Sequence, residues 1–314
     1  SMSRALVPPA PGAHGGDGAA LARALGVPPG EVLDLSATLN PLAPHPGAVV
    51  GRHLDALGRY PDPAAATAAL AAAIGVAPER VLLTNGGAEA IALVAAEQGR
   101  GWVEEPEFSL YRRHLARLDP TGPSWRSNPR TPGGLLAAPD EVAGVWDEAF
   151  YPLATGSWTR GDAERGAVVV GSLTKLLACP GLRLGYVLGD EALVAALRGR
   201  QACWSVGALA AEALPELLAA VDLPGWARCL AELRGQLVAL LSAHGLSPLP
   251  SEAPWVLVEE AWGLRDTLAA EGVLVRDCAS FGLAGTVRLA VPGPEGLARL
   301  DRALGPALAG GRAR

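Results

Sequence analysis

The chain has 314 residues, 50% of them hydrophobic and 18% charged, which suits one large or two modest globular domains. Its net charge of −6 excludes the concentrated basic surface that nucleic-acid or membrane binding requires, and no stretch approaches the roughly 20 apolar residues of a membrane span. The cysteines lack metal-binding spacing, so we expect no metal site and free thiols in a cytoplasmic protein: Cys179, Cys203, Cys229 and Cys278.

Short apolar runs alternate with helical segments between residues 81 and 200. This alternation predicts an α/β sheet that is mostly parallel and covered by helices on both faces. The proline-rich segment Leu118–Pro139 is expected to be a loop without a core strand. The expected strands are Val81–Leu83, Trp102–Glu104, Gly144–Asp147, Ala167–Gly171 and Leu184–Leu188, and the expected helices are Gly86–Gln98, Leu110–Leu118 and Glu191–Leu197.

The pattern changes after Trp204, where two long amphipathic helices precede three strands and a last helix. This order predicts a smaller α+β domain. We therefore expect an N-terminal arm over residues 1–45 that packs with the small domain, a large domain over 46–205 and the small domain over 206–314. The expected elements are helices Val206–Ala220, Trp226–His244 and Pro294–Leu304, and strands Trp255–Glu259, Val273–Arg276 and Val287–Val291.

The chain contains 26 Lys+Arg residues, of which only Lys175 is lysine. In such a sequence, arginine has replaced lysine wherever a positive charge is enough. A lysine that remains is therefore expected where its amine is needed. The amine can lose its proton and form a Schiff base with an aldehyde, whereas a guanidinium cannot. The alternative is a surface lysine that survives by chance.

Groups that suit a phosphorylated ligand surround Lys175 in the predicted sheet. Lys175 follows the most apolar strand, and Asp147 ends the strand before it. Ligands of α/β sheets bind at these carboxyl ends. Gly86-Gly87 opens a helix whose N–H groups and dipole favour a phosphate, and Arg183 lies eight residues after Lys175.

Pyridoxal 5′-phosphate needs this combination of groups: a lysine for its aldehyde, a carboxylate for its ring nitrogen, and a phosphate site with an arginine. Phe108 lies where an aromatic ring could stack on the cofactor. Taken singly, Asp147 is an ordinary strand-end acid and Phe108 a core residue. Together with Lys175 and Arg183, they predict a pyridoxal phosphate site.

With these motifs, the sequence resembles the fold-type I pyridoxal phosphate enzymes of the class I/II aminotransferase group. The resemblance runs from about His14 to Ala303 and rests on the pair formed by Ser-Leu-Thr-Lys at 172–175 with Arg183, and Asp-Glu-Ala-Phe at 147–150. It implies the aspartate aminotransferase-like fold, with a mostly parallel sheet in the large domain and a smaller α+β domain.

The resemblance also implies roles for individual residues. Lys175 resembles the Schiff-base lysine and Asp147 the partner of the pyridine nitrogen. Arg288 matches the arginine that binds a substrate carboxylate. Tyr60, in Arg-Tyr-Pro-Asp-Pro, matches a tyrosine that reaches the phosphate from the neighbouring subunit, which implies a homodimer with shared active sites. The residues that look like phosphate ligands are Gly86, Gly87, Ser172 and Arg183.

Three segments resemble the threonine-phosphate decarboxylase branch of this group more than its histidinol-phosphate aminotransferases. They are His-Gly-Gly-Asp at 14–17 with the Asp-Leu-Ser segment that leads to Asn40, Trp-Ser-Val at 204–206, and Arg-Asp-Cys-Ala-Ser-Phe at 276–281. The resemblance places His14 and Asn40 at the substrate. An alternative for His14 is an unbound arm residue, and for Arg276 an ion pair with Asp277.

The sequence departs from the family pattern at three places. Thr131 stands where an asparagine usually bonds the cofactor ring oxygen, and Gly207 replaces another asparagine. The segment between Leu118 and Asp147 is also short, which predicts the loss of a strand or helix from the large domain.

The implied function is pyridoxal phosphate-dependent decarboxylation of L-threonine O-3-phosphate to (R)-1-amino-2-propanol O-2-phosphate in cobalamin biosynthesis. One alternative is an aminotransferase of the histidinol-phosphate type. A second alternative is a degenerate family member without catalytic activity.

Overall fold

The computed structural model describes residues 6–311, and their contacts divide the chain into two compact units. The small unit contains the residues up to Pro41, Pro132–Gly134 and the residues from Cys229 onward, and the large unit contains Leu42–Thr131 and Leu135–Arg228. The large unit therefore ends at Arg228, and the small unit does not begin at residue 206 as expected but at Cys229. The reason is that the helix after residue 206 packs on helices of the large unit.

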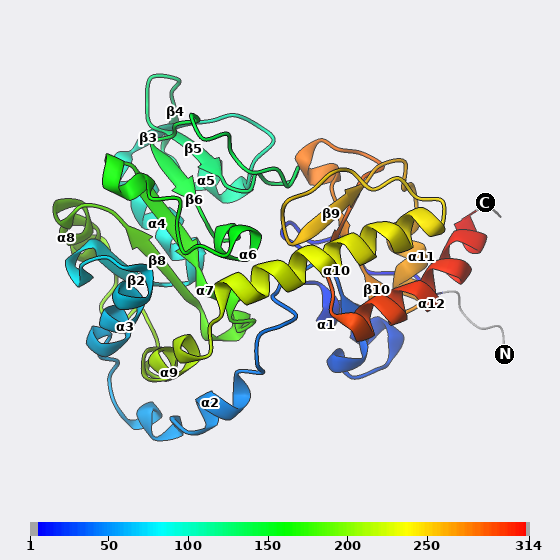
Figure 1. The fold of residues 1–314 in the computed structure, drawn as a ribbon, viewed down its shortest axis with the longest axis horizontal. Coiled ribbons are helices and arrows are strands. Elements are labelled where there is room, and N and C mark those ends of the chain that lie inside the picture. The colour runs from blue at the N-terminus through cyan, green and yellow to red at the C-terminus, as the bar shows by residue number, and fades with distance from the viewer. Residues whose placement is uncertain (1–5, 312–314) are drawn as a thin grey trace. The chain divides into compact units, whose positions relative to one another are not determined.

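The large unit is built on a seven-stranded sheet with the order β2-β8-β7-β6-β5-β3-β4 (Figure 1). Only β8 runs antiparallel to its neighbours, which confirms the expected mostly parallel α/β sheet. Since β2, β6 and β7 all run the same way, their carboxyl ends meet at one edge. The strands are β2 (Val81–Asn85), β3 (Arg100–Val103), β4 (Arg117–Leu118), β5 (Ser124–Ser127), β6 (Val145–Asp147), β7 (Val168–Ser172) and β8 (Leu184–Leu188).

Alternating side chains of these strands form one apolar core with helices α4, α5 and α8. Within it, Trp125, Val145, Val170 and Val187 are almost fully buried. The sheet-facing helix α8 starts where the Asp190 carboxylate accepts the Leu193 N–H at 2.7 Å. The helices are α2 (Gly47–Gly51), α3 (Ala64–Ile74), α4 (Gly86–Gln98), α5 (Ser109–His114), α6 (Tyr151–Thr155), α7 (Leu173–Leu176), α8 (Glu191–Arg200) and α9 (Ala208–Ala219).

The expectation of a loop without a core strand over Leu118–Pro139 is wrong, because β5 lies there and pairs with both β3 and β6. No helix occurs in the connection from β5 to β6, although parallel neighbours are usually joined by one. On the face opposite the apolar core, Trp146 is covered instead by guanidinium groups. Those of Arg126 and Arg160 lie 5.4 and 4.7 Å from its ring centre.

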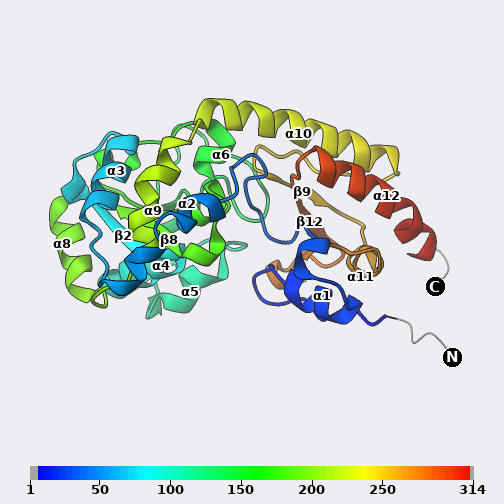
Figure 2. The same ribbon diagram turned by 90° about the horizontal axis from the view of Figure 1, so that it is seen from below.

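The small unit contains a three-stranded antiparallel sheet, β11-β12-β9, and a two-stranded parallel sheet, β1-β10 (Figure 2). The residues of the long helix α10 (Leu223–Ala243) belong to the large unit up to Arg228 and to the small unit from Cys229 onward. None of the helices in the described part of the chain has the length and apolar character to span a membrane. The remaining elements are α1 (Gly18–Leu25), β1 (Leu33–Asp34), β9 (Trp255–Val258), α11 (Leu264–Ala270), β10 (Val273–Leu274), β11 (Arg276–Asp277), β12 (Val287–Ala290) and α12 (Pro294–Gly311).

Candidate active site

Lys175 and Asp147 follow neighbouring parallel strands of the large unit. Asp147 ends β6, and Lys175 lies in the single turn α7 directly after β7. The half-buried Lys175 Nζ donates to Ser172 Oγ at 3.5 Å, and Ser172 Oγ lies 2.8 Å from Thr174 Oγ1. The structure thus brings the lysine, the carboxylate and the serine that the sequence singled out to one edge of the sheet.

The Asp147 carboxylate is held in a fixed orientation. Its Oδ2 accepts the hydroxyl of the fully buried Tyr111 at 2.5 Å, and its Oδ1 accepts the Ala149 N–H at 3.0 Å. Burial raises the pKa of Asp147, and these two hydrogen bonds together with the charge of Lys175 oppose that rise. A carboxylate so fixed beside an ammonium can hold a positively charged ring nitrogen.

The N-terminus of α4, which directly follows β2, forms a concave backbone surface. Gly86 has a φ of 73°, and a Cβ there would lie 2.3 Å from Arg183 Nη2. At Gly185, a Cβ would lie 2.4 Å from the Gly86 carbonyl carbon. Only residues without Cβ allow this approach. The free N–H groups of a helix with 13 residues and the exposed Arg183 guanidinium are therefore set close together, as a phosphate requires.

Two buried arginines lie directly opposite each other in the small unit. Arg276 on β11 pairs with Arg288 on β12, and they are 6% and 8% exposed. The Nε atom of each is buried without a hydrogen-bond partner, and neither residue forms a salt bridge within residues 6–311. Burial lowers the pKa of both, and for Arg288 the neighbouring Arg276 contributes to a pKa of about 10. Such uncompensated charges favour binding of an anion.

Each guanidinium of this arginine pair stacks on an aromatic ring. The Arg276 Cζ lies 5.0 Å from the centre of the Phe281 ring, and the Arg288 Cζ lies 5.2 Å from that of Trp255. The alternative of an ion pair between Arg276 and Asp277 is not found among the described residues, and Asp277 Oδ1 accepts the Ala279 N–H at 2.7 Å. The arginines are thus oriented by ring stacking and not by carboxylates.

The N-terminal segment lies against Arg276. Its Nη2 donates to the Ala13 carbonyl at 3.0 Å, and the Gly16 N–H donates to Ser36 Oγ at 2.9 Å. A Cβ on Gly15 would lie 3.3 Å from Arg276 Nη1. The structure therefore gathers three segments that are distant in the sequence: the exposed His14 segment, the segment that leads to the buried Asn40, and β11.

The other site residues expected from the sequence all lie in the large unit. Phe108 is half-buried and contacts Tyr111 edge-on, with 5.7 Å between ring centres. Thr131 is 7% exposed, and its N–H donates to Ser127 Oγ at 2.8 Å. Tyr60 is 77% exposed, with its ring 4.6 Å from that of Trp204. Its expected role at a neighbouring subunit stays a prediction.

Comparisons with known proteins agree with this geometry. The family described as Aminotransferase class I and II matches residues 137–304. Threonine-phosphate decarboxylase of Salmonella typhimurium is 31% identical, over 86% of this chain and 88% of the relative. The chain belongs to the class I and II aminotransferase family.

A second relative is histidinol-phosphate aminotransferase 2 of Pseudomonas aeruginosa, with 28% identity over 92% of each chain. The fold is similar to that of a Sinorhizobium meliloti histidinol-phosphate aminotransferase solved with pyridoxal-5′-phosphate. That comparison has a TM-score of 0.79 and 18% identity, and covers 93% of this chain and 94% of the other. As a member of the class I and II aminotransferase family, the chain is an enzyme that uses pyridoxal 5′-phosphate. The large unit has groups that fit this cofactor: a helix N-terminus beside Arg183 suits a phosphate, the Asp147 carboxylate suits a ring nitrogen, and the Lys175 amine suits an aldehyde.

The glycine at the start of α4 gives a direct test of the phosphate site. Gly86→Ala is expected to weaken pyridoxal phosphate binding about tenfold or more, since the new Cβ would displace Arg183 and the backbone φ of 73° disfavours alanine. The measurement is a cofactor titration followed by absorbance. Gly181→Ala is the matched control, since its Cβ would meet nothing within 4 Å. Equal affinities of the two variants would contradict the assignment.

Sequence reasoning missed three residues that support these sites. The sequence indicates Arg276 only as part of the Arg-Asp-Cys-Ala-Ser-Phe segment or of an ion pair, and it does not single out Glu107. Glu89 was also overlooked: its Oε1 accepts the Asn85 N–H at 3.0 Å and its Oε2 accepts the Ser205 hydroxyl. The one available signal is an acid four residues after Asn85, the residue that precedes the helix, because such a side chain can fold back to the N–H groups at the helix start.

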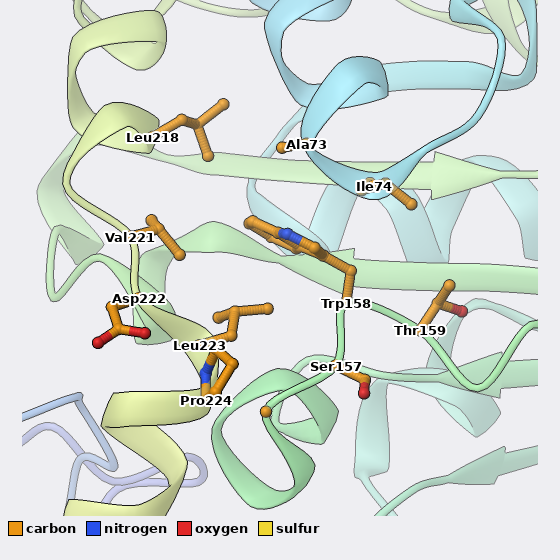
Figure 3. Close-up of a pocket in the computed structure, with 11 residues that line it drawn as sticks. Ala73, Ile74, Ser157, Trp158, Thr159, Leu218, Val221, Asp222, Leu223 and Pro224 are labelled. Atoms are coloured by element: carbon orange, nitrogen blue, oxygen red, sulfur yellow. The ribbon is translucent and has the colours of Figure 1, made fainter.

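A separate hollow of about 460 Å³ lies elsewhere in the large unit (Figure 3). It is formed by the end of α3, the Ser157–Thr159 segment and the connection from α9 to α10. Trp158 lies in its middle and Asp222 at one side. It contains none of the candidate site residues, and Asp222 is the only ionisable residue that lines it.

Proposed function

We propose that the enzyme decarboxylates L-threonine O-3-phosphate to (R)-1-amino-2-propanol O-2-phosphate in cobalamin biosynthesis. The observation that carries the proposal is the pair of buried arginines, Arg276 and Arg288. Two guanidinium groups suit a substrate that has both a carboxylate and a phosphate. The relative from Salmonella typhimurium, which is named for this activity, supports the same substrate.

Each residue has a role in this proposal. Arg288 binds the substrate carboxylate, and His14 and Asn40 bind substrate groups at the N-terminal segment. Bound pyridoxal phosphate supplies the electron sink for the bond that breaks at Cα. Asp147 keeps a proton on the ring nitrogen. The bond from Cα to the carboxylate carbon breaks, CO2 leaves, and a C–H bond forms when Lys175 Nζ gives a proton to Cα.

The second candidate is amino transfer from histidinol phosphate or another amino acid. The relative from Pseudomonas aeruginosa supports it, since it matches 92% of the chain, against 86% for the relative from Salmonella typhimurium. Histidinol phosphate has a phosphate but no carboxylate, so as amino donor it would leave one of the two arginines without an anion. The acceptor 2-oxoglutarate has two carboxylates and would occupy both arginines, so the mismatch counts only against the donor.

An assay of two products distinguishes the candidates. The purified enzyme with pyridoxal phosphate is incubated with carboxyl-labelled O-phospho-L-threonine, and separately with histidinol phosphate and 2-oxoglutarate. We expect labelled CO2 in the first reaction and no glutamate in the second. Glutamate formation without CO2 release would assign the enzyme to the aminotransferases.

We also propose a cytoplasmic homodimer with shared active sites. Exposed apolar side chains support the dimer. Leu54, Leu57 and Tyr60 lie within one short segment and the Tyr60 ring lies 4.6 Å from that of Trp204; the exposed fractions of these four residues are 55%, 67%, 77% and 61%. Apolar side chains grouped in this way are typical of an interface between subunits. Tyr60 would then reach the cofactor phosphate of the partner subunit.

A further inference from the structure

A buried carboxyl group lies near Asp147 without a role in the proposed reaction. Glu107 precedes α5 and is 2% exposed. Its Oε2 accepts the Ser127 N–H at 2.7 Å, and its Oε1 accepts the Ser127 hydroxyl. A glutamate is rarely buried so completely unless its oxygens are hydrogen-bonded, and here one serine supplies both bonds.

Ser127 connects Glu107 to the turn that carries Thr131. The Ser127 hydroxyl donates to Glu107 and accepts the Thr131 N–H at 2.8 Å. The adjacent Asn128 N–H donates to the Asp147 carbonyl at 2.9 Å. The turn is therefore held at one end by Asp147 and at the other through Ser127 by Glu107, so a change at Glu107 is transmitted to Thr131.

Glu107 also lies among ionisable groups from each neighbouring element. Burial raises its pKa to about 7, the Ser127 hydrogen bonds and Arg130 oppose this rise, and Asp147 adds to it. Its charge in turn raises the pKa of Tyr111 on α5 and opposes the lowering of the pKa of Arg126 on β5. A pKa of about 7 lies within the neutral pH range, and the carboxyl interacts electrostatically with Asp147.

We propose that Glu107 is a positioning residue of the cofactor site: through Ser127 it fixes the turn that presents Thr131, and it gives Asp147 an ionisable neighbour. Ionised Glu107 adds negative charge beside Asp147 and favours protons on the bound cofactor. Protonated Glu107 removes that effect but keeps the turn. The inference rests on pyridoxal phosphate binding at Lys175, and it is independent of which reaction follows.

The test compares the visible absorbance of the bound cofactor in the wild type and in Glu107→Gln between pH 5.5 and 8.5, without substrate. Glutamine has the shape of protonated glutamic acid at every pH. We expect the two spectra to coincide at low pH and to separate with a midpoint of about 7, the pKa of Glu107. The exposed Glu104→Gln is the matched control and should follow the wild type.

A second variant keeps the test decisive if Glu107→Gln does not fold. Ser127→Ala removes a hydrogen bond that lowers the pKa of Glu107, so the pH-dependent change of the wild-type spectrum should move to higher pH. Spectra of the wild type and Glu107→Gln that coincide throughout, or differ by the same amount at every pH, would overturn the proposal. Since no substrate is present, failure of the proposed decarboxylation would leave this result unaffected.

Discussion

Lys175→Ala is expected to abolish the visible absorbance band of the bound cofactor and to reduce turnover by roughly 10²–10⁴-fold. The chain has no other lysine, so no neighbouring side-chain amine can take its place. The measurement is an absorbance spectrum after addition of pyridoxal phosphate, followed by the CO2 assay. A visible band that persists in this variant would show that Lys175 is not the attachment point.

Lys175→Arg is the matched control for charge. Burial raises the pKa of Asp147, and the positive charge of Lys175 opposes this rise. Arginine keeps that positive charge, but its guanidinium does not form a Schiff base. We expect this variant to lack the visible band while its pyridoxal phosphate affinity stays higher than that of Lys175→Ala. A higher affinity of Lys175→Arg than of Lys175→Ala would separate the covalent role of the amine from the effect of its charge.

Arg288→Met is expected to lower kcat/KM for O-phospho-L-threonine on the order of 10²-fold, because a buried charge-assisted contact with the substrate is worth several kcal/mol. Arg276→Met should have a similar effect. For Arg288→Met, the free energy of unfolding of the substrate-free protein should be retained, since the change removes a buried charge without a salt bridge. Arg276→Met also loses the hydrogen bond to the Ala13 carbonyl, so some loss of stability is expected there. Steady-state kinetics and denaturant unfolding measure the two quantities.

The control for this prediction is Arg265→Met. Arg265 is also 6% exposed and lies in the small unit, but it donates to the Pro9 carbonyl at 2.8 Å and pairs with Asp266. Its loss should lower stability and leave KM unchanged. If Arg276→Met and Arg288→Met behave like Arg265→Met, the arginine pair is structural.

The edge of the sheet that holds the candidate site could be predicted because its signals are local. Lys175, Asp147 and the Gly86-Gly87 turn each follow a strand directly, and the carboxyl ends of parallel strands must meet. The strand β5 could not be predicted in the same way. Only Trp125 in Ser124–Ser127 is apolar, and the burial of Arg126 depends on Trp146 and Glu141, which are distant in the sequence.

The arginine pair and Glu107 show a different limit. Arg276 and Arg288 face each other only because of the register between β11 and β12, and neither local sequence reveals that register. Glu107 follows β3 and contacts Ser127 at the end of the neighbouring strand β5. The spacing of the two residues in the sequence does not reveal this contact. Contacts that depend on pairing between distant segments, such as those of these three residues, could therefore be found only in the structure.

The position of Lys175 has a practical consequence. It is half-buried in α7, and the sequence contains no second side-chain amine. An amine-specific reagent can therefore modify only this residue and the chain's terminal amine. A protease specific for lysine has one cleavage position in the polypeptide, after Lys175. Chemical labelling and limited proteolysis thus report directly on access to Lys175, without any engineered probe.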